Sequence, residues 1–139
     1  MLIQLKNKEN LKFDDFTIKC SIGKNGIKKR RHEGDKTTPI GTFKLLKIYY
    51  RKDKVLRPLT KIKTKIITKN MGWCNDPKHK KYNKEIIVNK NISHEKLYRR
   101  DNKYDYLIVI NYNIKKTIPY KGSAIFLHLT KNYEATAGC

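Results

Sequence analysis

Apolar and polar side chains alternate along much of this chain, a period-two pattern that predicts β-strands with one buried face. The clearest case is residues 16–22, in which Phe, Ile, Cys and Ile alternate with Thr, Lys and Ser. The turn sequence Gly-Lys-Asn-Gly at residues 23–26 follows this strand and predicts a hairpin. Because Cys20 shares the apolar face, we expect its thiol to lie in the core.

Longer apolar runs predict the central part of a sheet. Residues 106–112 and 123–129 are rich in aliphatic, β-branched and aromatic side chains, as is typical of central strands. Residues 42–50 form another predicted strand, whose alternation slips at Leu45 and Leu46 and so indicates a β-bulge. Two shorter strands are predicted at residues 62–66 and 85–88.

One segment has the start signals of a helix. Ser93 is placed to cap residues 94–100, with Glu95 and Lys96 in the first turn. No internal repeat and no Pro/Gly/Ser-rich linker divides the chain, so we expect residues 1–139 to form a single domain. The predicted fold class is mainly β, with one or two short helices.

The chain is strongly basic, with 33 Lys+Arg against 12 Asp+Glu and a net charge of +21. Such a field attracts polyanions, including nucleic acid, anionic lipid and anionic wall polymer. The lysines are spread along the whole chain beside many Asn, Ile and Tyr residues, so a bias toward AT-rich codons explains much of the charge. No apolar run has the length of a membrane span, and residues 1–6 lack the features of a signal peptide.

The three cysteines predict neither a disulfide framework nor a structural zinc site, since no C-x-x-C pair exists. The best candidate for chemistry is Cys139, which follows His128 after an intervening polar loop. A returning segment would bring the thiol beside the imidazole as a thiolate–imidazolium pair. Gly138 permits a tight turn, in which the Cys139 amide and a neighbouring amide would form an oxyanion hole. The alternative for His128 is a histidine that only completes the core.

Three segments together resemble the L,D-transpeptidase catalytic domain, also called the YkuD domain. Residues 33–43 are similar to its T-P-x-G-x-F entry segment. His128 and the sequence Thr-Ala-Gly-Cys at residues 136–139 are similar to its histidine followed by S/T-x-G-C. Gly-Trp-Cys-Asn-Asp-Pro at residues 72–77 and Gly-Ser-Ala-Ile-Phe at residues 122–126 resemble a subgroup of the family.

The resemblance covers roughly residues 15–139, and the joint, ordered presence of the motifs makes it specific. It implies a β-sandwich or barrel in which Cys139 is the nucleophile and His128 the general base. The amides of Gly138 and Cys139 would form the oxyanion hole. The cysteine would attack a peptidoglycan stem peptide, and an amine or water would then take the acyl group, as in a transpeptidase or carboxypeptidase. No metal or organic cofactor is implied.

The same resemblance implies peptidoglycan stem peptides as partners and a place in the periplasm or cell envelope, and we expect a monomer. Two departures bear on activity. Ala137 stands where many members have a second histidine, and the chain stops at Cys139, so we expect a C-terminally truncated domain. Trp73, His94 and Arg99 are expected at the substrate cleft, where Arg99 would meet a substrate carboxylate.

Two other functions stay open. A non-catalytic basic module would bind anionic wall polymer or nucleic acid, with the steep salt dependence of such binding. Recognised RNA-binding patterns and a stacking platform are missing from the sequence, so specific nucleic-acid binding is not expected. A degenerate family member would bind stem peptides without turnover, and its thiol would titrate as an ordinary cysteine.

Overall fold

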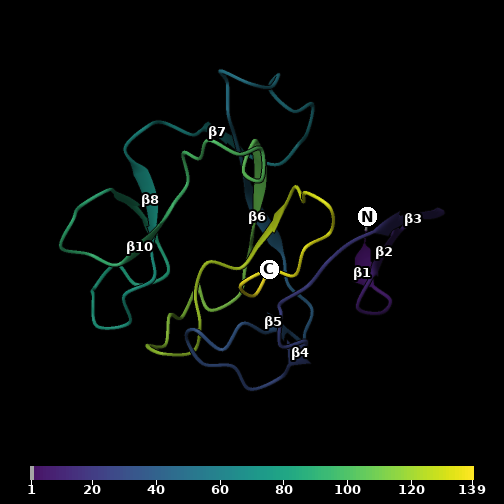
Figure 1. Cartoon of the computed structure of the whole chain (residues 1–139), viewed down its shortest axis with the longest axis horizontal. Helices are drawn as coiled ribbons and strands as arrows, with labels where there is room; N and C mark the ends of the chain where they lie inside the picture. The colour runs from purple at the N-terminus through teal and green to yellow at the C-terminus, as the bar shows by residue number, and fades with distance from the viewer. Residues whose placement is uncertain (1) are drawn as a thin grey trace.

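The computed structural model describes residues 2–139, and in that range it contains β-strands and no helix (Figure 1). The mainly β class predicted from the sequence is confirmed. In chain order the strands are β1 (Ile3–Leu5), β2 (Asn10–Phe13), β3 (Phe16–Lys19), β4 (Ile27–Lys28), β5 (Thr38–Pro39), β6 (Leu45–Tyr50), β7 (Thr64–Ile66), β8 (Met71–Cys74), β9 (Glu85–Ile87), β10 (His94–Lys96), β11 (Tyr106–Ile110) and β12 (Phe126–His128).

The largest sheet has the strand order β12-β11-β6-β7. As its apolar sequence predicts, β11 lies inside this sheet, antiparallel to both β12 and β6. Between β6 and β11 the register shifts, because Val109 pairs with Lys47 whereas Ile110 pairs with Leu45. Leu46 is therefore the extra residue, and the predicted bulge at Leu45 and Leu46 is confirmed.

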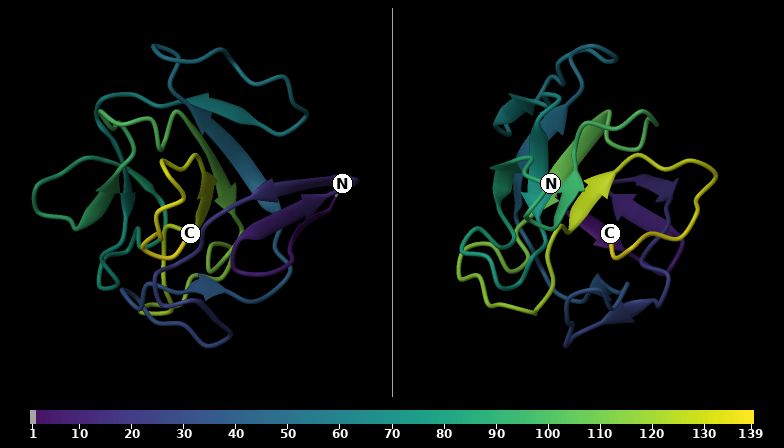
Figure 2. Two further views of the ribbon diagram at one scale, coloured as in Figure 1. Left: turned by 45° about the vertical axis from the view of Figure 1, so that its right-hand side comes forward. Right: turned by 60° about the vertical axis from the view of Figure 1, so that its left-hand side comes forward.

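A second sheet, with the order β10-β8-β9, shares its core with the first (Figure 2). Trp73 on β8 meets Phe126 on β12 edge to face, with ring centroids 5.2 Å apart. It also meets Tyr49 on β6 at 6.4 Å in the same geometry. Edge-to-face aromatic pairs add directional attraction to the burial of apolar area. These rings therefore tie the two sheets together and fix the position of β12.

The helix predicted at residues 94–100 is wrong, because residues 94–96 form strand β10. This strand pairs antiparallel with β8, and Glu95 lies opposite Trp73. Leu97, directly after the strand, is fully buried in the core. Ser93 and Glu95 favour a helix through local signals. The hydrogen bonds between β10 and β8 and the burial of Leu97 stabilise the strand more.

The prediction that residues 16–22 bury one face holds only at Ile22, which is buried, and is wrong for β3. Every residue of β3 is exposed, with Phe16 at 64% and Ile18 at 48%. Cys20 is only half-buried, so its assignment to the core is wrong. In Figure 1 the N-terminal sheet, β1-β2-β3, lies to one side of the larger one. The side chains of β3 are therefore exposed to solvent.

The turn at residues 23–26 forms, since the Gly26 amide donates to the Gly23 carbonyl over 2.8 Å. The strand after it, β4, pairs in parallel with β5 rather than with β3, so the predicted hairpin is wrong. Turn residue types thus predict the turn but not the partner of the next strand. Within residues 2–139 no helix has the length and apolar character needed to cross a membrane.

Candidate active site

Strand β12 carries His128 to the edge of the candidate site. Its ring lies edge-on to Tyr104, with centroids 5.2 Å apart, and Nδ1 lies 2.7 Å from the carbonyl oxygen of Leu129. A carbonyl only accepts hydrogen bonds, so Nδ1 carries the proton and Nε2 keeps its lone pair. Burial lowers the pKa of His128, and the nearby cations Lys103 and Arg99 lower it further. The imidazole is therefore neutral at pH 7 and available as a base.

The chain returns from β12 in such a way that Cys139 lies beside the same strand. Cys139 Sγ lies 3.4 Å from the amide nitrogen of Phe126 and 3.4 Å from the carbonyl oxygen of Ala124. Among residues 2–139 no hydrogen bond joins this sulfur to the ring of His128. The Cys139 thiol and the His128 imidazole thus both lie at β12, and the hydrogen-bond partners of the thiol are backbone groups.

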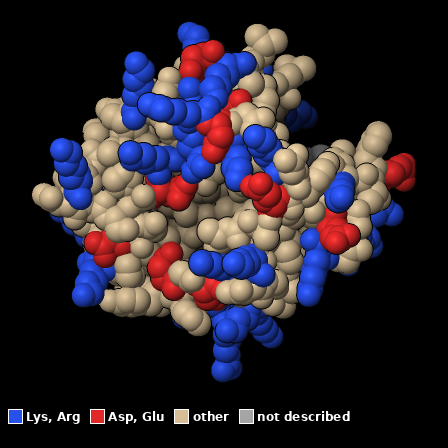
Figure 3. Space-filling view, viewed as in Figure 1, with Lys and Arg blue, Asp and Glu red and all other residues tan. Residues whose placement is uncertain are grey.

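The surroundings of the thiol keep it protonated. Burial raises the pKa of Cys139 to about 11; the Phe126 amide and the Arg31 guanidinium act in the opposite direction, and Glu95 adds to the rise. Figure 3 shows uncharged side chains in the middle of the face where Figure 1 places the C-terminus, with charged side chains around them. The resting site therefore holds a neutral thiol and a neutral imidazole, unlike the thiolate–imidazolium pair expected from the sequence.

Two threonines hold the C-terminal turn. Thr136 Oγ1 donates to the carbonyl oxygen of Cys139 over 2.7 Å and accepts the amide of Gly138 over 3.1 Å. Thr38 Oγ1, from the entry segment, donates to the same Cys139 oxygen over 3.1 Å. Two motifs that are far apart in sequence therefore meet here. The Gly138 amide is engaged within the turn, so it would have to exchange this bond in order to stabilise an oxyanion.

A buried arginine, which the sequence interpretation missed, lies against this turn. Arg31 is 8% exposed; its Nε donates to Thr37 Oγ1 and its Nη2 to Asp35 Oδ1, each over 3.1 Å. Its Nη1 has no partner within residues 2–139. A Cβ added at Gly138, where φ is 144°, would lie 3.0 Å from Nη2. The only sequence signal was the basic block at residues 28–31.

The arginine and Asp35 form a charged pair. Burial opposes ionisation of the carboxyl, but hydrogen bonds from the amides of Thr37 and His32 and the charge of Arg31 lower the pKa of Asp35. The pair is almost fully buried on both sides. The positive charge near the thiol is therefore fixed in place by the fold.

Asn83 positions the segment that receives the thiol. Its Oδ1 accepts the indole N–H of Trp73 over 2.9 Å and the amide of Ala124 over 3.0 Å. Its Nδ2 donates to the carbonyl oxygens of Tyr112 and Asn113 over 3.0 and 2.7 Å. Asn83 is 1% exposed, so this network links β8 to the residue whose carbonyl accepts the Cys139 thiol. Nothing in the sequence predicts this role of Asn83, which lies six residues after the motif of residues 72–77.

A charged cluster lies behind Tyr104, the ring that His128 contacts. Glu95 Oε1 accepts the Tyr104 hydroxyl over 3.1 Å and an Arg99 guanidinium N–H over 3.3 Å. Arg99 also pairs with Asp101 over 2.6 Å and lies over the Tyr104 ring at 5.1 Å. The ring of Tyr104 thus contacts both Arg99 and His128.

The other two residues expected at the cleft are Trp73 and His94. Trp73 is 5% exposed and belongs to the core between the sheets. His94 bonds through Nδ1 to the carbonyl oxygen of Ile92 over 2.6 Å, and its ring fills the space above Gly72. In this structure Trp73 supports β12 through Phe126, and His94 packs against β8.

Cys74 takes part in a second thiol–imidazole contact, since its sulfur lies 3.8 Å from His79 Nδ1. That nitrogen already accepts the Lys81 amide over 3.1 Å, and Cys74 is fully buried. Burial raises the pKa of the Cys74 thiol, so this pair stabilises a loop rather than presenting a nucleophile. Within residues 2–139 no group of three or more His, Cys, Asp or Glu side chains is arranged to hold a metal ion.

The chain matches the family model of the L,D-transpeptidase catalytic domain, YkuD, over residues 3–139. No curated protein and no solved structure matches it. The matched region includes every strand and loop of the site, from the entry segment at Thr38 to Cys139. The chain therefore belongs to the L,D-transpeptidase catalytic domain family.

Proposed function

We propose that this protein transfers acyl groups between peptidoglycan stem peptides, with Cys139 as nucleophile and His128 as general base. The observation that carries the proposal is the position of Cys139 Sγ, 3.4 Å from the Phe126 amide on the strand that ends in His128. Membership of a family of enzymes with this chemistry supports it. An amine as acceptor gives L,D-transpeptidase activity, and water gives L,D-carboxypeptidase activity.

The neutral resting pair favours a mechanism in which the thiol is deprotonated during attack. His128 Nε2 takes the thiol proton while sulfur bonds to the carbonyl carbon of the stem peptide. The amide C–N bond then breaks, and the leaving D-alanine amine receives the proton from His128. In the second half the acceptor amine attacks the thioester and gives its proton to His128, and the released thiolate takes that proton back. The thiol must first exchange its contact with Ala124 for one with His128.

Two fixed features of the fold support charge development at the sulfur. The Phe126 amide donates to sulfur, and the Arg31 guanidinium lies against the turn that carries it. Both lower the pKa of the Cys139 thiol against the opposing effect of burial. Arg31 offsets the negative charge of Glu95 and so eases thiolate formation. The amides of Cys139 and Gly138 are the candidates for the oxyanion hole.

Arg99 and Glu95 suit the recognition of a substrate that carries both a carboxylate and an ammonium group. A guanidinium binds a carboxylate through two parallel hydrogen bonds, so a substrate carboxylate would replace Asp101, which Arg99 Nε and Nη2 bind in this structure. Glu95 would pair with the ammonium. Neutralising Glu95 in this way also removes a charge that opposes thiolate formation at Cys139. Such a substrate is a stem peptide with a diamino-acid centre, and we infer that the protein acts at the cell envelope.

The proposal is tested by incubating the protein with a tetrapeptide muropeptide and following D-alanine release or exchange by mass spectrometry. A carbapenem should also acylate the protein and add its mass to Cys139. Cys139→Ala should lose both signals while keeping the fold, whereas Cys20→Ala should keep both. A folded protein that releases no D-alanine and gains no carbapenem mass would contradict the proposal. If it still binds the muropeptide, it is a binding protein without turnover.

A further inference from the structure

We propose that the loop between β6 and β7 docks this protein on an anionic lipid bilayer, with Leu56 and Leu59 entering the lipid interface. Leu56 is 85% exposed and Leu59 is 106% exposed, more than any other large apolar side chains in residues 2–139. Only three positions separate them, on a loop that projects from the end of the β6–β11 sheet (Figure 1). The inference goes beyond acyl transfer and is independent of it.

The loop is anchored at its base, so the leucines are displayed by a defined backbone. The Tyr106 hydroxyl donates to the carbonyl oxygen of Leu56 over 2.8 Å. Lys54 Nζ donates to the carbonyl oxygens of Arg100 and Asp101, each over 3.0 Å. The carbonyl oxygen of Arg51 accepts two amides at the start of the loop over 2.9 Å. These bonds use the backbone and leave the leucine side chains in water, where they cost free energy unless a partner covers them.

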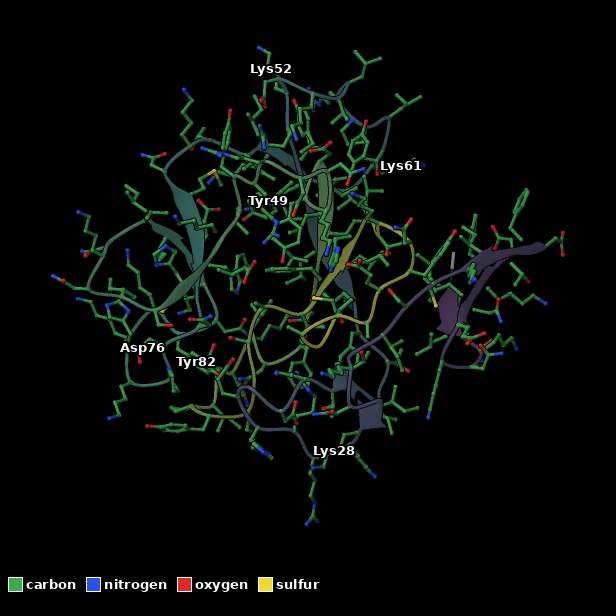
Figure 4. All side chains as sticks on the ribbon, in the orientation of Figure 1. Lys28, Tyr49, Lys52, Lys61, Asp76 and Tyr82 are labelled. Atoms are coloured by element: carbon green, nitrogen blue, oxygen red, sulfur yellow. The ribbon has the colours of Figure 1, made fainter. Side chains whose placement is uncertain are left out.

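The charges around the leucines favour an anionic surface. Between residues 52 and 65 the sequence holds six basic residues and one acid, Asp53. Two of the six are paired with acids outside this segment, Lys54 with Asp105 and Lys65 with Glu85, which leaves Lys52, Arg57, Lys61 and Lys63. Asp53 pairs with Arg51 over 2.6 Å, so its charge is already neutralised. Lys52 and Lys61 extend from the two sides of the loop, as Figure 4 shows, and Arg57 lies between the leucines in sequence. Basic side chains that flank exposed leucines are the pattern of proteins that bind the membrane interface.

A lipid surface fits the loop better than a soluble polyanion does. A polyanion would pair with the basic residues but would leave Leu56 and Leu59 in water. A bilayer interface accepts both groups, because headgroups meet the cations and the acyl boundary takes the leucines. Lys28, also exposed and labelled in Figure 4, lies at the opposite end of the molecule and provides a comparison for charge alone.

The experiment measures co-sedimentation of the full chain with vesicles of phosphatidylglycerol and phosphatidylcholine in equal parts, and with phosphatidylcholine alone. We expect binding to the anionic vesicles only. Leu56→Ser with Leu59→Ser should weaken it by about tenfold or more, since two exposed leucines lose their burial. Leu2→Ser with Ile87→Ser is the matched control, because these residues are 66% and 73% exposed elsewhere, and it should leave binding unchanged.

A second pair of variants distinguishes the contribution of this loop's charges to vesicle binding from that of the protein's net charge. Arg57→Gln with Lys61→Gln should weaken vesicle binding more than Lys28→Gln with Lys116→Gln, although both pairs remove the same charge. Equal effects of the two pairs, together with no effect of the leucine pair, would overturn the proposal and leave a non-specific basic surface. The proposal would also be overturned if the leucine variant bound vesicles as tightly as the parent does and both proteins bound soluble polyphosphate with that same affinity. The partner would then be a polyanion.

Insertion can be seen directly with Leu56→Trp in the background of the single native tryptophan, Trp73, which is buried. We expect its fluorescence to shift to shorter wavelength when anionic vesicles are added, because the indole leaves water. An unchanged spectrum at saturating vesicle concentration would contradict insertion of the loop.

Discussion

Strands β12 and β3 have similar sequences in one respect and opposite surroundings in the structure. The sequence predicts a buried face for both, from the alternation of residues 16–22 for β3 and from the apolar run of residues 123–129 for β12. On β12, Phe126 is 1% exposed and packs between rings from β8 and the loop before β11. On β3, Phe16 and Ile18 are 64% and 48% exposed. The difference lies in the second layer, which β12 has and β3 lacks.

The comparison shows that an apolar pattern in the sequence predicts a strand but not what covers it. The face of β12 meets a second sheet, so its side chains are held in single positions. The ring of Phe16 stacks on Phe13 of the neighbouring strand at 5.3 Å, and the sheet itself adds little more. This contrast accounts for the location of the candidate nucleophile, because a reactive group needs a fixed support and β12 offers one at its open edge.

The largest expected effect concerns the two half-buried cysteines that accompany these strands. Burial raises the pKa of Cys139 to about 11, so its alkylation by iodoacetamide should rise by about tenfold per pH unit between pH 7 and that value. The thiol is protonated below its pKa, hence the low rate at neutral pH. Cys20, beyond β3, should react faster than Cys139 at pH 7. Peptide mass spectrometry measures both in one sample.

Faster alkylation of Cys139 than of Cys20 at pH 7 would mean that the thiol is already ionised in the resting protein. The His128→Ala variant then identifies the cause. If it slows the reaction, the imidazole takes the thiol proton before substrate binds, contrary to the neutral pair inferred from the structure.

The next effect compares phenylalanines of the two strands. Phe126→Ala should lower the free energy of unfolding by about 3–5 kcal/mol, because it leaves a cavity between the sheets. Phe16→Ala should cost less than ~1 kcal/mol, since it removes one aromatic stack in water. Urea denaturation followed by the fluorescence of Trp73 measures both. Equal costs would show that a layer covers β3 in solution.

The sequence predicts features that depend on local signals and misses those that depend on contact with distant segments. The bulge at Leu46 was predictable because a slip of alternation is a local signal. Strand β10 was not, since the helix signals at Ser93 and Glu95 are local while its pairing with β8 depends on a distant segment. Burial of Arg31 was equally hidden, because it depends on contact with a turn more than a hundred residues away.

A smaller effect is expected from the guanidinium against the C-terminal turn. Arg31→Gln should cost about 1–3 kcal/mol of stability, because Asp35 loses a charged partner but keeps the amides of His32 and Thr37. It should also raise the pKa of Cys139 further, since Arg31 lowers it. Arg30→Gln is the control, as Arg30 is exposed. A thiol titration unchanged by Arg31→Gln would remove the arginine from the proposed mechanism.

The smallest effect tests whether β3 is left uncovered. Ile18→Thr keeps a β-branched side chain and removes apolar surface from a position that is 48% exposed. We expect a change in the free energy of unfolding within ~0.5 kcal/mol, as for other surface substitutions. Val109→Thr is the matched change on β11, where the side chain is 2% exposed, and it should cost about 1–3 kcal/mol because it buries a hydroxyl. If both cost the same, β3 has a covering partner in solution, and its apolar face is then an interface.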